Sequence, residues 1–307
     1  MRHDIAARDA LEGTAGGDVG ESAPQARRFA SWEQAVRWLR DQPAQQQLVI
    51  DAYYDDPLSA AAQRYAACDE WAAIRRELPA ASGARALDVG AGRGIASYAL
   101  AREGFAVTAL EPDPSDLVGA GAIRRLAAEA ALPITVVEEF SERLPFDVAS
   151  FDLVFARAVL HHTRDLKGAC REFARVLKPG GRLIAVREHV ISRPEDLPAF
   201  LDLHPLHKLY GGENAFLLDE YKQALHEAGF ALDAVLPPLA SAINLAPQSK
   251  RGVQEEIARR ASRGSRVLQR LAAAALRLPG VWPMLLPALE RIDHRPGRLY
   301  SFVAHRR

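Results

Sequence analysis

The sequence predicts a doubly wound α/β protein whose mostly parallel sheet has seven strands and a Rossmann-like arrangement. Between residues 84 and 190, short apolar runs alternate with helical patterns. A glycine-rich stretch, ALDVGAGRGIAS at residues 86–97, follows the first run, and another apolar run at 297–305 closes the chain. Strands that alternate with helices form a parallel sheet with helices on both faces.

Composition restricts the class of protein before any motif is considered. The 307 residues are 49% hydrophobic and 25% charged, as is typical of a soluble globular protein. The net charge of +0 gives no global attraction for nucleic acid, so we expect no nucleic-acid partner. Cys68 and Cys170 lack metal-like spacing, and the charged first residues do not resemble a signal peptide, which predicts a cytoplasmic protein.

The N-terminal part predicts a tail followed by a helical cap. Residues 1–28 include a Gly-, Ala- and Ser-rich stretch with little periodicity, and we expect them to form a flexible tail. Residues 29–80 have helical patterns with one break at 42–47. Ser31 is the expected N-cap of the first helix, and Asp56 the N-cap of a helix with Pro57 in its first turn.

The remaining residues, 81–307, predict the α/β domain itself. The expected strands cover residues 84–90, 106–112, 134–139, 151–160, 182–190, 231–239 and 297–305. Helices are expected at 95–104, at 167–181 and at 218–230, and residues 124–132 are expected to end another helix. Two insertions interrupt the alternation, an irregular one at about 191–216 and a mostly helical one at about 240–296, before the last strand.

The glycine loop predicts a nucleotide-like ligand without a pyrophosphate. Gly90 and Gly92 fit the start of the G-x-G-x-x-G dinucleotide pattern, but its third glycine is replaced by Ile95 and glycine returns at Gly94. Glu111 ends the second strand, where an acid can accept hydrogen bonds from two ribose hydroxyls. The alternatives are a sharp strand-to-helix turn for the glycines and a helix-capping role for the acid.

Two further motifs complete the pattern, ERLPFDVASFDLVFARAVLHH at 142–162 and LKPGGRLIAV at 177–186. Together with the glycine loop, they resemble the class I S-adenosylmethionine-dependent methyltransferases. The similarity is strongest to the branch that shares motifs with quinone-biosynthesis and small-molecule methyltransferases, and it covers about 84–238 and 297–305. The resemblance implies S-adenosyl-L-methionine as the cofactor.

The resemblance also implies which residues bind that cofactor. One group would surround its methionine and ribose portions: Asp88, Gly90, Ala91, Gly92, Glu111 and Arg157. Pro112 would lie beside the adenine. Because Phe140 stands where relatives carry an acid, Ser141 or Glu142 would contact the adenine through the backbone, or Glu139 would do so by a shift of one residue.

Candidate catalytic residues lie beyond the carboxyl ends of the strands, where parallel sheets bind their ligands. Histidine is the natural base near neutral pH. His162 is the first choice, followed by His204 or His207, although a histidine here can also pack or cap. Glu188, His204 and His207 have side chains of the types that bind metals, but their spacing in the sequence is not that of a known metal site, and no metal is predicted. The cap aromatics Tyr53, Tyr54, Tyr65 and Trp71 are candidates for the pocket wall or for the core.

These observations predict an enzyme that methylates an O- or N-nucleophile of a small molecule, such as a secondary metabolite, lipid or glycan precursor. The alternatives are a non-catalytic S-adenosylmethionine-binding or regulatory protein and, with less support, an NAD(P)-dependent oxidoreductase. Residues 249–289 are basic and then apolar, which allows membrane-surface association as a minor alternative to covering a sheet edge or meeting a partner subunit. The sequence specifies neither the acceptor nor the oligomeric state.

Overall fold

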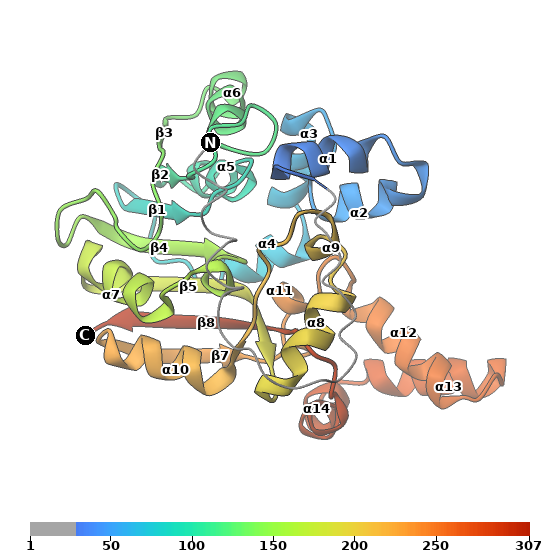
Figure 1. The fold of residues 1–307 in the computed structure, drawn as a ribbon. Helices are drawn as coiled ribbons and strands as arrows, with labels where there is room; N and C mark the ends of the chain where they lie inside the picture. The colour runs from blue at the N-terminus through green and yellow to red at the C-terminus, as the bar shows by residue number, and fades with distance from the viewer. Residues whose placement is uncertain (1–28) are drawn as a thin grey trace, which may run out of the picture.

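The computed structural model describes residues 29–307, and a twisted sheet forms its centre (Figure 1). The strand order is β3-β2-β1-β4-β5-β8-β7, with β6 paired to β5. The strands are β1 (Arg85–Val89), β2 (Ala106–Leu110), β3 (Ile134–Val137), β4 (Phe151–Arg157), β5 (Leu177–Ile191), β6 (Phe216–Leu217), β7 (Phe230–Leu236) and β8 (Arg298–Arg306). β1 to β5 pair in parallel, whereas β8 runs antiparallel to both β5 and β7.

The seven predicted strands and their mostly parallel arrangement are therefore confirmed, and the two-residue β6 is the strand that the sequence pattern missed. The predicted tail at 1–28 lies outside the described residues.

Helices cover both faces of the sheet and extend the molecule beyond its edge (Figure 1). The N-terminal cap contains α1 (Trp32–Arg40), α2 (Gln46–Asp51), α3 (Leu58–Ala66) and α4 (Asp69–Ile74). The helices between strands are α5 (Ile95–Arg102), α6 (Ala120–Ala130), α7 (Leu166–Val176) and α10 (Leu218–Glu227). The insertions contribute α8 (Leu197–Leu203), α9 (His207–Tyr210), α11 (Ala242–Leu245), α12 (Lys250–Ala261), α13 (Arg266–Arg277) and α14 (Val281–Ile292).

Alternation along β5 explains why the sheet needs helices on both faces. Leu183 and Ala185 join the core cluster that includes Phe173 of α7, whereas Ile184 and Val186 join the cluster on the opposite face. Successive side chains of a strand point to opposite faces. Because all four residues are apolar and fully buried, neither face of β5 can be left in water.

The predicted N-cap at Asp56 is wrong, and the long helix that was expected to follow it is broken. Pro57 is the N-cap of α3 and provides no side-chain cap, while the Asp56 carboxylate forms ion pairs at 2.6 Å with both Arg40 and Arg93. A carboxylate bound to two guanidinium groups has stronger partners than the free amides of a helix end. Cys68 separates α3 from α4 and caps α4 through its sulfur.

Both insertions contain regular helices. The segment expected to be irregular at 191–216 contains the 3-10 helix η3 (Pro194–Asp196), α8 and α9. The mostly helical character expected for 240–296 is observed in α11 to α14. Within the described residues, no single helix has the length and apolar character to cross a membrane, although α13 and α14, bent by 108°, meet the length and composition criterion as a pair.

Candidate active site

The glycine loop joins β1 to α5 at the carboxyl edge of the sheet, and its backbone is held by the end of β2. Gly90, Gly92 and Gly94 have φ values of +60°, +55° and +81°. The Ala91 amide donates to the Leu110 carbonyl at 3.0 Å, and the Gly92 amide donates to Glu111 Oε2 at 2.7 Å. The loop is thus a tight turn whose backbone faces the acid predicted to bind ribose.

The first two glycines differ in what surrounds them. A Cβ added to Gly90 would lie 2.8 Å from Val159 Cγ2, whereas one added to Gly92 would meet nothing within 4 Å. Gly90 is therefore required for contact with the segment after β4. Open space for a ligand lies instead beside Gly92.

Glu111 meets the requirements for a ribose ligand. Its side chain is 8% exposed, Oε2 accepts from Gly92, and Oε1 accepts from the Asp113 amide at 2.9 Å. Burial raises the pKa of Glu111 to about 7. Each carboxylate oxygen can accept a second hydrogen bond, so both retain capacity for a hydroxyl donor. These residues fit the sugar of S-adenosylmethionine, and the half-buried Pro112 follows directly.

The other predicted cofactor residues are engaged with the protein itself. Asp88 is buried, and its Oδ2 accepts a 2.5 Å hydrogen bond from Ser97 Oγ on α5, while burial raises the pKa of Asp88 to about 7. Ser141 Oγ donates to Glu142 Oε2 at 3.1 Å, and Glu142 Oε1 accepts from the Arg164 amide at 3.0 Å. Their contacts with a bound cofactor stay a prediction.

Arg157 occupies the end of β4, as expected, but its guanidinium is directed at the cap. Its Nε and Nη2 donate to the Glu70 carboxylate at 2.6 and 3.1 Å. The guanidinium also lies over the rings of Tyr53 and Tyr65, at 5.8 and 5.4 Å from their centroids. Arg157 therefore joins the sheet to the cap, and its predicted contact with the methionine portion is not tested.

Arg93 of the glycine loop makes a second connection to the cap, which the sequence pattern did not predict. Its side chain is 3% exposed. Nη1 donates to the carbonyls of Tyr53 and Asp55 at 2.8 and 2.9 Å, and Nη2 donates to Asp56 Oδ1 at 2.6 Å. Because these bonds hold the chain before α3 against the loop, the cap and the glycine turn form one structural unit.

Among the four aromatic candidates of the cap, Tyr54 has Glu213 and Glu111 among its electrostatic neighbours. Its hydroxyl accepts from Trp32 Nε1 at 3.2 Å, and burial raises its pKa to about 12, with a further contribution from Glu213 and Glu111. Tyr54 thus lies within electrostatic reach of both acids. Tyr65 and Trp71 are 0% and 1% exposed and belong to the core.

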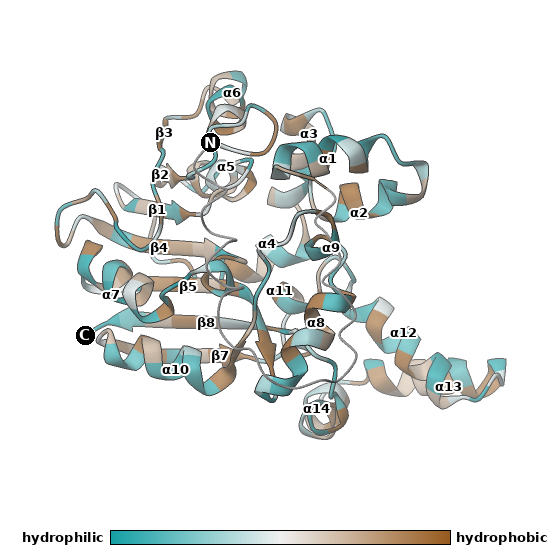
Figure 2. Ribbon diagram, in the orientation of Figure 1, coloured by the Kyte–Doolittle hydropathy of each residue, from teal (hydrophilic) through white to brown (hydrophobic). Residues whose placement is uncertain are grey.

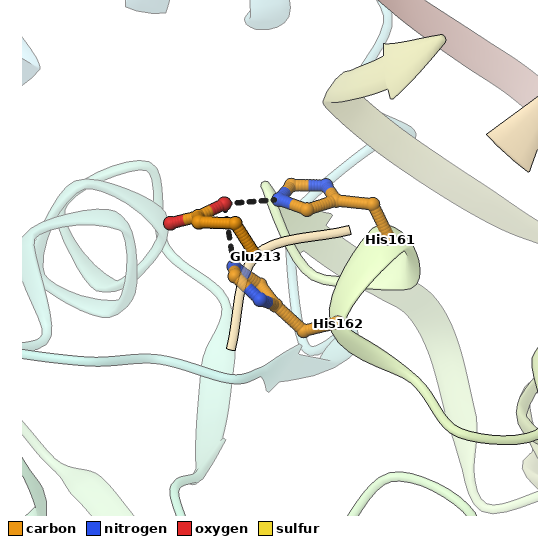
Figure 3. Close-up of side chains that lie close together, drawn as sticks. All are labelled: His161, His162 and Glu213. Atoms are coloured by element: carbon orange, nitrogen blue, oxygen red, sulfur yellow. Dashed lines mark ion pairs between the residues drawn. The ribbon is translucent and has the colours of Figure 1, made fainter. Parts of the chain in front are cut away.

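A histidine cluster follows β4, and Glu213 lies at its centre (Figure 3). His161 Nδ1 lies 2.7 Å from Glu188 Oε2, in β5. The Nε2 atoms of His161 and His162 lie 3.6 and 3.8 Å from Glu213 Oε2, and His204 Nδ1 lies 3.7 Å from Glu213 Oε1. The chain thus brings residues from three separate segments to the same edge of the sheet.

The cluster sets different protonation states for its members. Burial alone would lower the pKa of His161, but the hydrogen bond to Glu188 and the nearby Glu213 carboxylate raise it to about 9. Burial and the neighbouring His161 lower the pKa of His162. The pKa of Glu213 falls to about 2, because its histidine neighbours outweigh the effect of burial. At neutral pH the cluster therefore contains an imidazolium, a neutral imidazole and a carboxylate.

Two of the three predicted catalytic histidines, His162 and His204, lie beside Glu213. His207, at the start of α9, contacts His204 through its backbone amide, and the groups of possible ligands around Glu213 do not include its ring. The sequence patterns had selected neither His161 nor Glu213 as a site residue. The sequence signal that could have found them was Glu188, because an acid inside a predicted apolar strand is expected to be buried and to need a partner.

The histidine cluster is connected directly to the glycine loop. Val159, which packs against Gly90, precedes His161 by two residues, and its amide donates to Glu188 Oε1 at 3.1 Å. The His161 amide donates to Glu188 Oε2, also at 3.1 Å.

A hollow of about 390 Å³ on the surface, between α1, α3 and α6, is lined by none of the predicted site residues.

Comparison with known proteins agrees with this geometry. Residues 87–185 match the family model described as a methyltransferase domain. The chain is 35% identical over 156 residues to 27-O-demethylrifamycin SV methyltransferase of Amycolatopsis mediterranei, covering 50% of this chain and 56% of that protein. It is 38% identical over 103 residues to a ubiquinone biosynthesis O-methyltransferase of Methylocella silvestris, covering 34% of this chain and 39% of that protein. The matched segments thus span about half or less of those relatives.

The solved structure of geranyl diphosphate C-methyltransferase from Streptomyces coelicolor shares the fold, with a TM-score of 0.55 at 15% identity, and the match covers 92% of this chain and all of that one. The predicted α/β fold, glycine loop and motifs after β3 and β4 thus occur together in one recognised family. Residues 87–185 therefore form a methyltransferase domain, and the fold around them is that of the class I S-adenosylmethionine-dependent methyltransferases.

Proposed function

We propose that this protein transfers a methyl group from S-adenosylmethionine to a hydroxyl group of a small molecule. The observation that carries the proposal is the contact between Gly90 and Val159. Through it, the loop predicted to hold the cofactor meets the segment that begins the histidine cluster, so donor and acceptor sites would be adjacent. Similarity to two O-methyltransferases supports oxygen as the acceptor atom.

The bound cofactor supplies an activated methyl group, and the residues of this chain prepare the acceptor. His162 Nδ1 is 2.8 Å from the Gly212 carbonyl, to which it can only donate, so Nε2 carries the lone pair. A neutral imidazole of this kind can take the proton from a hydroxyl. His161, held as an imidazolium by Glu188, can stabilise the negative charge that develops on the acceptor oxygen.

A transfer assay with matched acceptors tests the proposal. Purified protein is incubated with methyl-labelled cofactor and pairs of phenols and anilines that share one carbon skeleton. We expect label on the hydroxyl member of a pair. His162→Ala should lower the rate by about 10²–10⁴-fold without weakening cofactor binding, because it removes a proton acceptor. His226→Ala, on the exposed side of α10, is the matched control.

Two results would contradict the proposal. Label on the amine alone would assign the protein to N-methylation. Cofactor binding without transfer to any acceptor of the panel would favour the non-catalytic alternative.

A further inference from the structure

The cluster around Glu213 has the donor atoms and the spacing of a metal site. We propose that His161 Nε2, His162 Nε2 and the Glu213 carboxylate bind a divalent transition-metal ion (Figure 3). The three ligand atoms lie within 4.8 Å of one another. Two imidazoles and one carboxylate are a donor set that suits zinc, iron and cobalt, and they leave coordination positions open.

The distances in the cluster fit an ion better than direct hydrogen bonds. The two Nε2 atoms lie 3.6 and 3.8 Å from Glu213 Oε2, beyond the range of an N–H···O hydrogen bond. Ligand atoms about 2.1 Å from a tetrahedral ion are separated by roughly 3.4 Å. The two distances from Nε2 to Glu213 Oε2 therefore lie within a few tenths of an ångström of this separation.

The orientation of the two imidazole rings is a second, independent observation. His161 Nδ1 faces Glu188 Oε2 at 2.7 Å, and His162 Nδ1 faces the Gly212 carbonyl at 2.8 Å. Histidines that bind metals usually donate their other ring nitrogen to a carboxylate or a carbonyl, which fixes the tautomer and the ring orientation. Both rings meet this condition, and both leave Nε2 directed at Glu213.

The balance of charge also favours a dication. The Glu188 and Glu213 side chains are 0% and 10% exposed, and two carboxylates this well buried need positive charge nearby. A dication would compensate both carboxylates, and because protons compete with metals for imidazole and carboxylate ligands, binding should weaken as the pH falls.

The site can be reached, and it would face the acceptor. The His162 side chain is 42% exposed, which leaves a route from solvent. This step rests on the proposed function: in the metal-bound form the ion, rather than the His162 base and the His161 imidazolium, would lower the pKa of the acceptor hydroxyl, and the open coordination positions would take that hydroxyl and a neighbouring oxygen. That preference would select acceptors with two adjacent oxygen atoms, such as catechol-like or hydroxyketone groups.

Direct metal binding tests the site without an activity assay. The full chain is stripped with a chelator, dialysed, and titrated with Co²⁺ while its visible absorption is followed. We expect about one equivalent to bind, with displacement by Zn²⁺. His162→Ala and Glu213→Gln should each weaken binding at least tenfold, whereas His305→Ala, in the exposed part of β8, should not change it.

No Co²⁺ binding by the wild-type chain, or equal binding by the Glu213→Gln variant, would overturn the inference. Methyl transfer that persists unchanged in the stripped protein would exclude the ion from catalysis while leaving the proposed function standing. Metal binding by a protein that transfers no methyl group would support the metal site and argue against the proposed function.

A separate observation concerns the outer helices α13 and α14, whose apolar side chains are exposed. Along α13, Val267, Leu271 and Ala274 recur at spacings that place them on one side of the helix, and Leu278 follows as its extended C-cap residue. Val267, Leu271 and Leu278 are 68%, 62% and 58% exposed. The opposite side of α13 faces the protein, where Ala273 and Leu276 are buried.

Basic residues border this apolar stripe. Arg266 and Arg270 are exposed and four residues apart, which aligns them along one side of the stripe, whereas Arg277 on the same side is paired with Glu255 of α12. On α14, Met284 and Ile292 are 73% and 70% exposed. Figure 2 shows that both helices mix apolar and polar residues, and that α13 projects from the body of the molecule.

We propose that α13 and α14 bind to an anionic lipid surface. An amphipathic helix with apolar residues on one face and arginines beside them inserts at the boundary between headgroups and acyl chains. The arginines supply the charge complementarity, since each adds about 1 kcal/mol near an anionic surface. Such an anchor would place the active site next to acceptors dissolved in the membrane.

Vesicle sedimentation tests the lipid surface. We expect the full chain to bind vesicles of phosphatidylglycerol and phosphatidylcholine, and to bind pure phosphatidylcholine at least tenfold more weakly. Leu271→Glu should abolish binding, whereas Val148→Glu, at a residue that is 65% exposed in the segment before β4, should not. Absence of vesicle binding, or a stripe found buried between two copies of the chain in solution, would overturn the proposal.

Discussion

Arg157 of β4 and Glu70 of α4 are 87 residues apart in the chain, yet their side chains form a 2.6 Å ion pair at the carboxyl edge of the sheet. Burial alone would raise the pKa of Glu70, but Arg157 and then Arg187 hold it below its usual value. The pair ties the N-terminal cap to the central strand. Its loss should affect the whole protein rather than one helix.

Glu70→Ala should lower the free energy of unfolding by about 3–5 kcal/mol, because it leaves a buried guanidinium without its partner. The measurement is equilibrium denaturation in urea. Glu33→Ala removes an ion pair on α1 whose arginine side chain is 67% exposed, and it should cost no more than about 1 kcal/mol. Equal effects of the two substitutions would argue against a connecting role for Glu70.

The raised pKa of His161 predicts how stability depends on pH. The pKa rises from an unfolded value near 6.5 to about 9, so protonation stabilises the folded state fully below about pH 6.5. This contribution, about 3 kcal/mol, should disappear as the pH rises from about 6.5 to 9.

Two measurements check this dependence. NMR titration of the His161 ring should give a midpoint far above 7. The unfolding free energy of His161→Gln should lack the decline of the wild type over the same pH window. A ring that titrates at or below 6.5 would show that the ion pair with Glu188 does not form.

The two neighbouring glycines should respond differently to alanine. Gly90→Ala would place a methyl group 2.8 Å from Val159 at a positive φ, so it should destabilise the protein. Gly92→Ala meets no protein atom, and it should cost only about 1–2 kcal/mol for its left-handed backbone while impairing cofactor binding. Thermal unfolding and calorimetric titration separate these effects. Adding Val159→Ala should restore part of the stability of Gly90→Ala but none of the binding of Gly92→Ala.

Glu111→Ala should weaken the binding of S-adenosylmethionine by about 1–3 kcal/mol, since two hydroxyl donors would lose their acceptor. Part of the loss would come from the glycine loop, because Glu111 Oε2 also holds the Gly92 amide. Comparison of adenosine with 2′,3′-dideoxyadenosine by calorimetry isolates the hydroxyl contribution. If the wild type and the variant distinguish these two ligands equally well, Glu111 does not bind ribose.

Much of the fold could be predicted from the sequence because it depends on local patterns. All seven main strands were predicted, since buried parallel strands are short apolar runs between helical segments. The glycine loop and Glu111 were also predictable, because both follow directly from the ends of strands. β6 was missed, since its two residues are too few for any periodicity.

Only the tertiary structure decided how distant segments combine. Asp56 was predicted to cap a helix, but folding places it beside Arg93, and a charged partner outweighs a helix end. His161, Glu188 and Glu213 come from β5 and from the two segments that follow β4 and α9. No spacing in the sequence could reveal their meeting, because it depends on the strands running parallel and ending at one edge. Local sequence thus determined the elements and their order, whereas the protonation states and contacts of the site depend on burial and distance, which exist only in the folded chain.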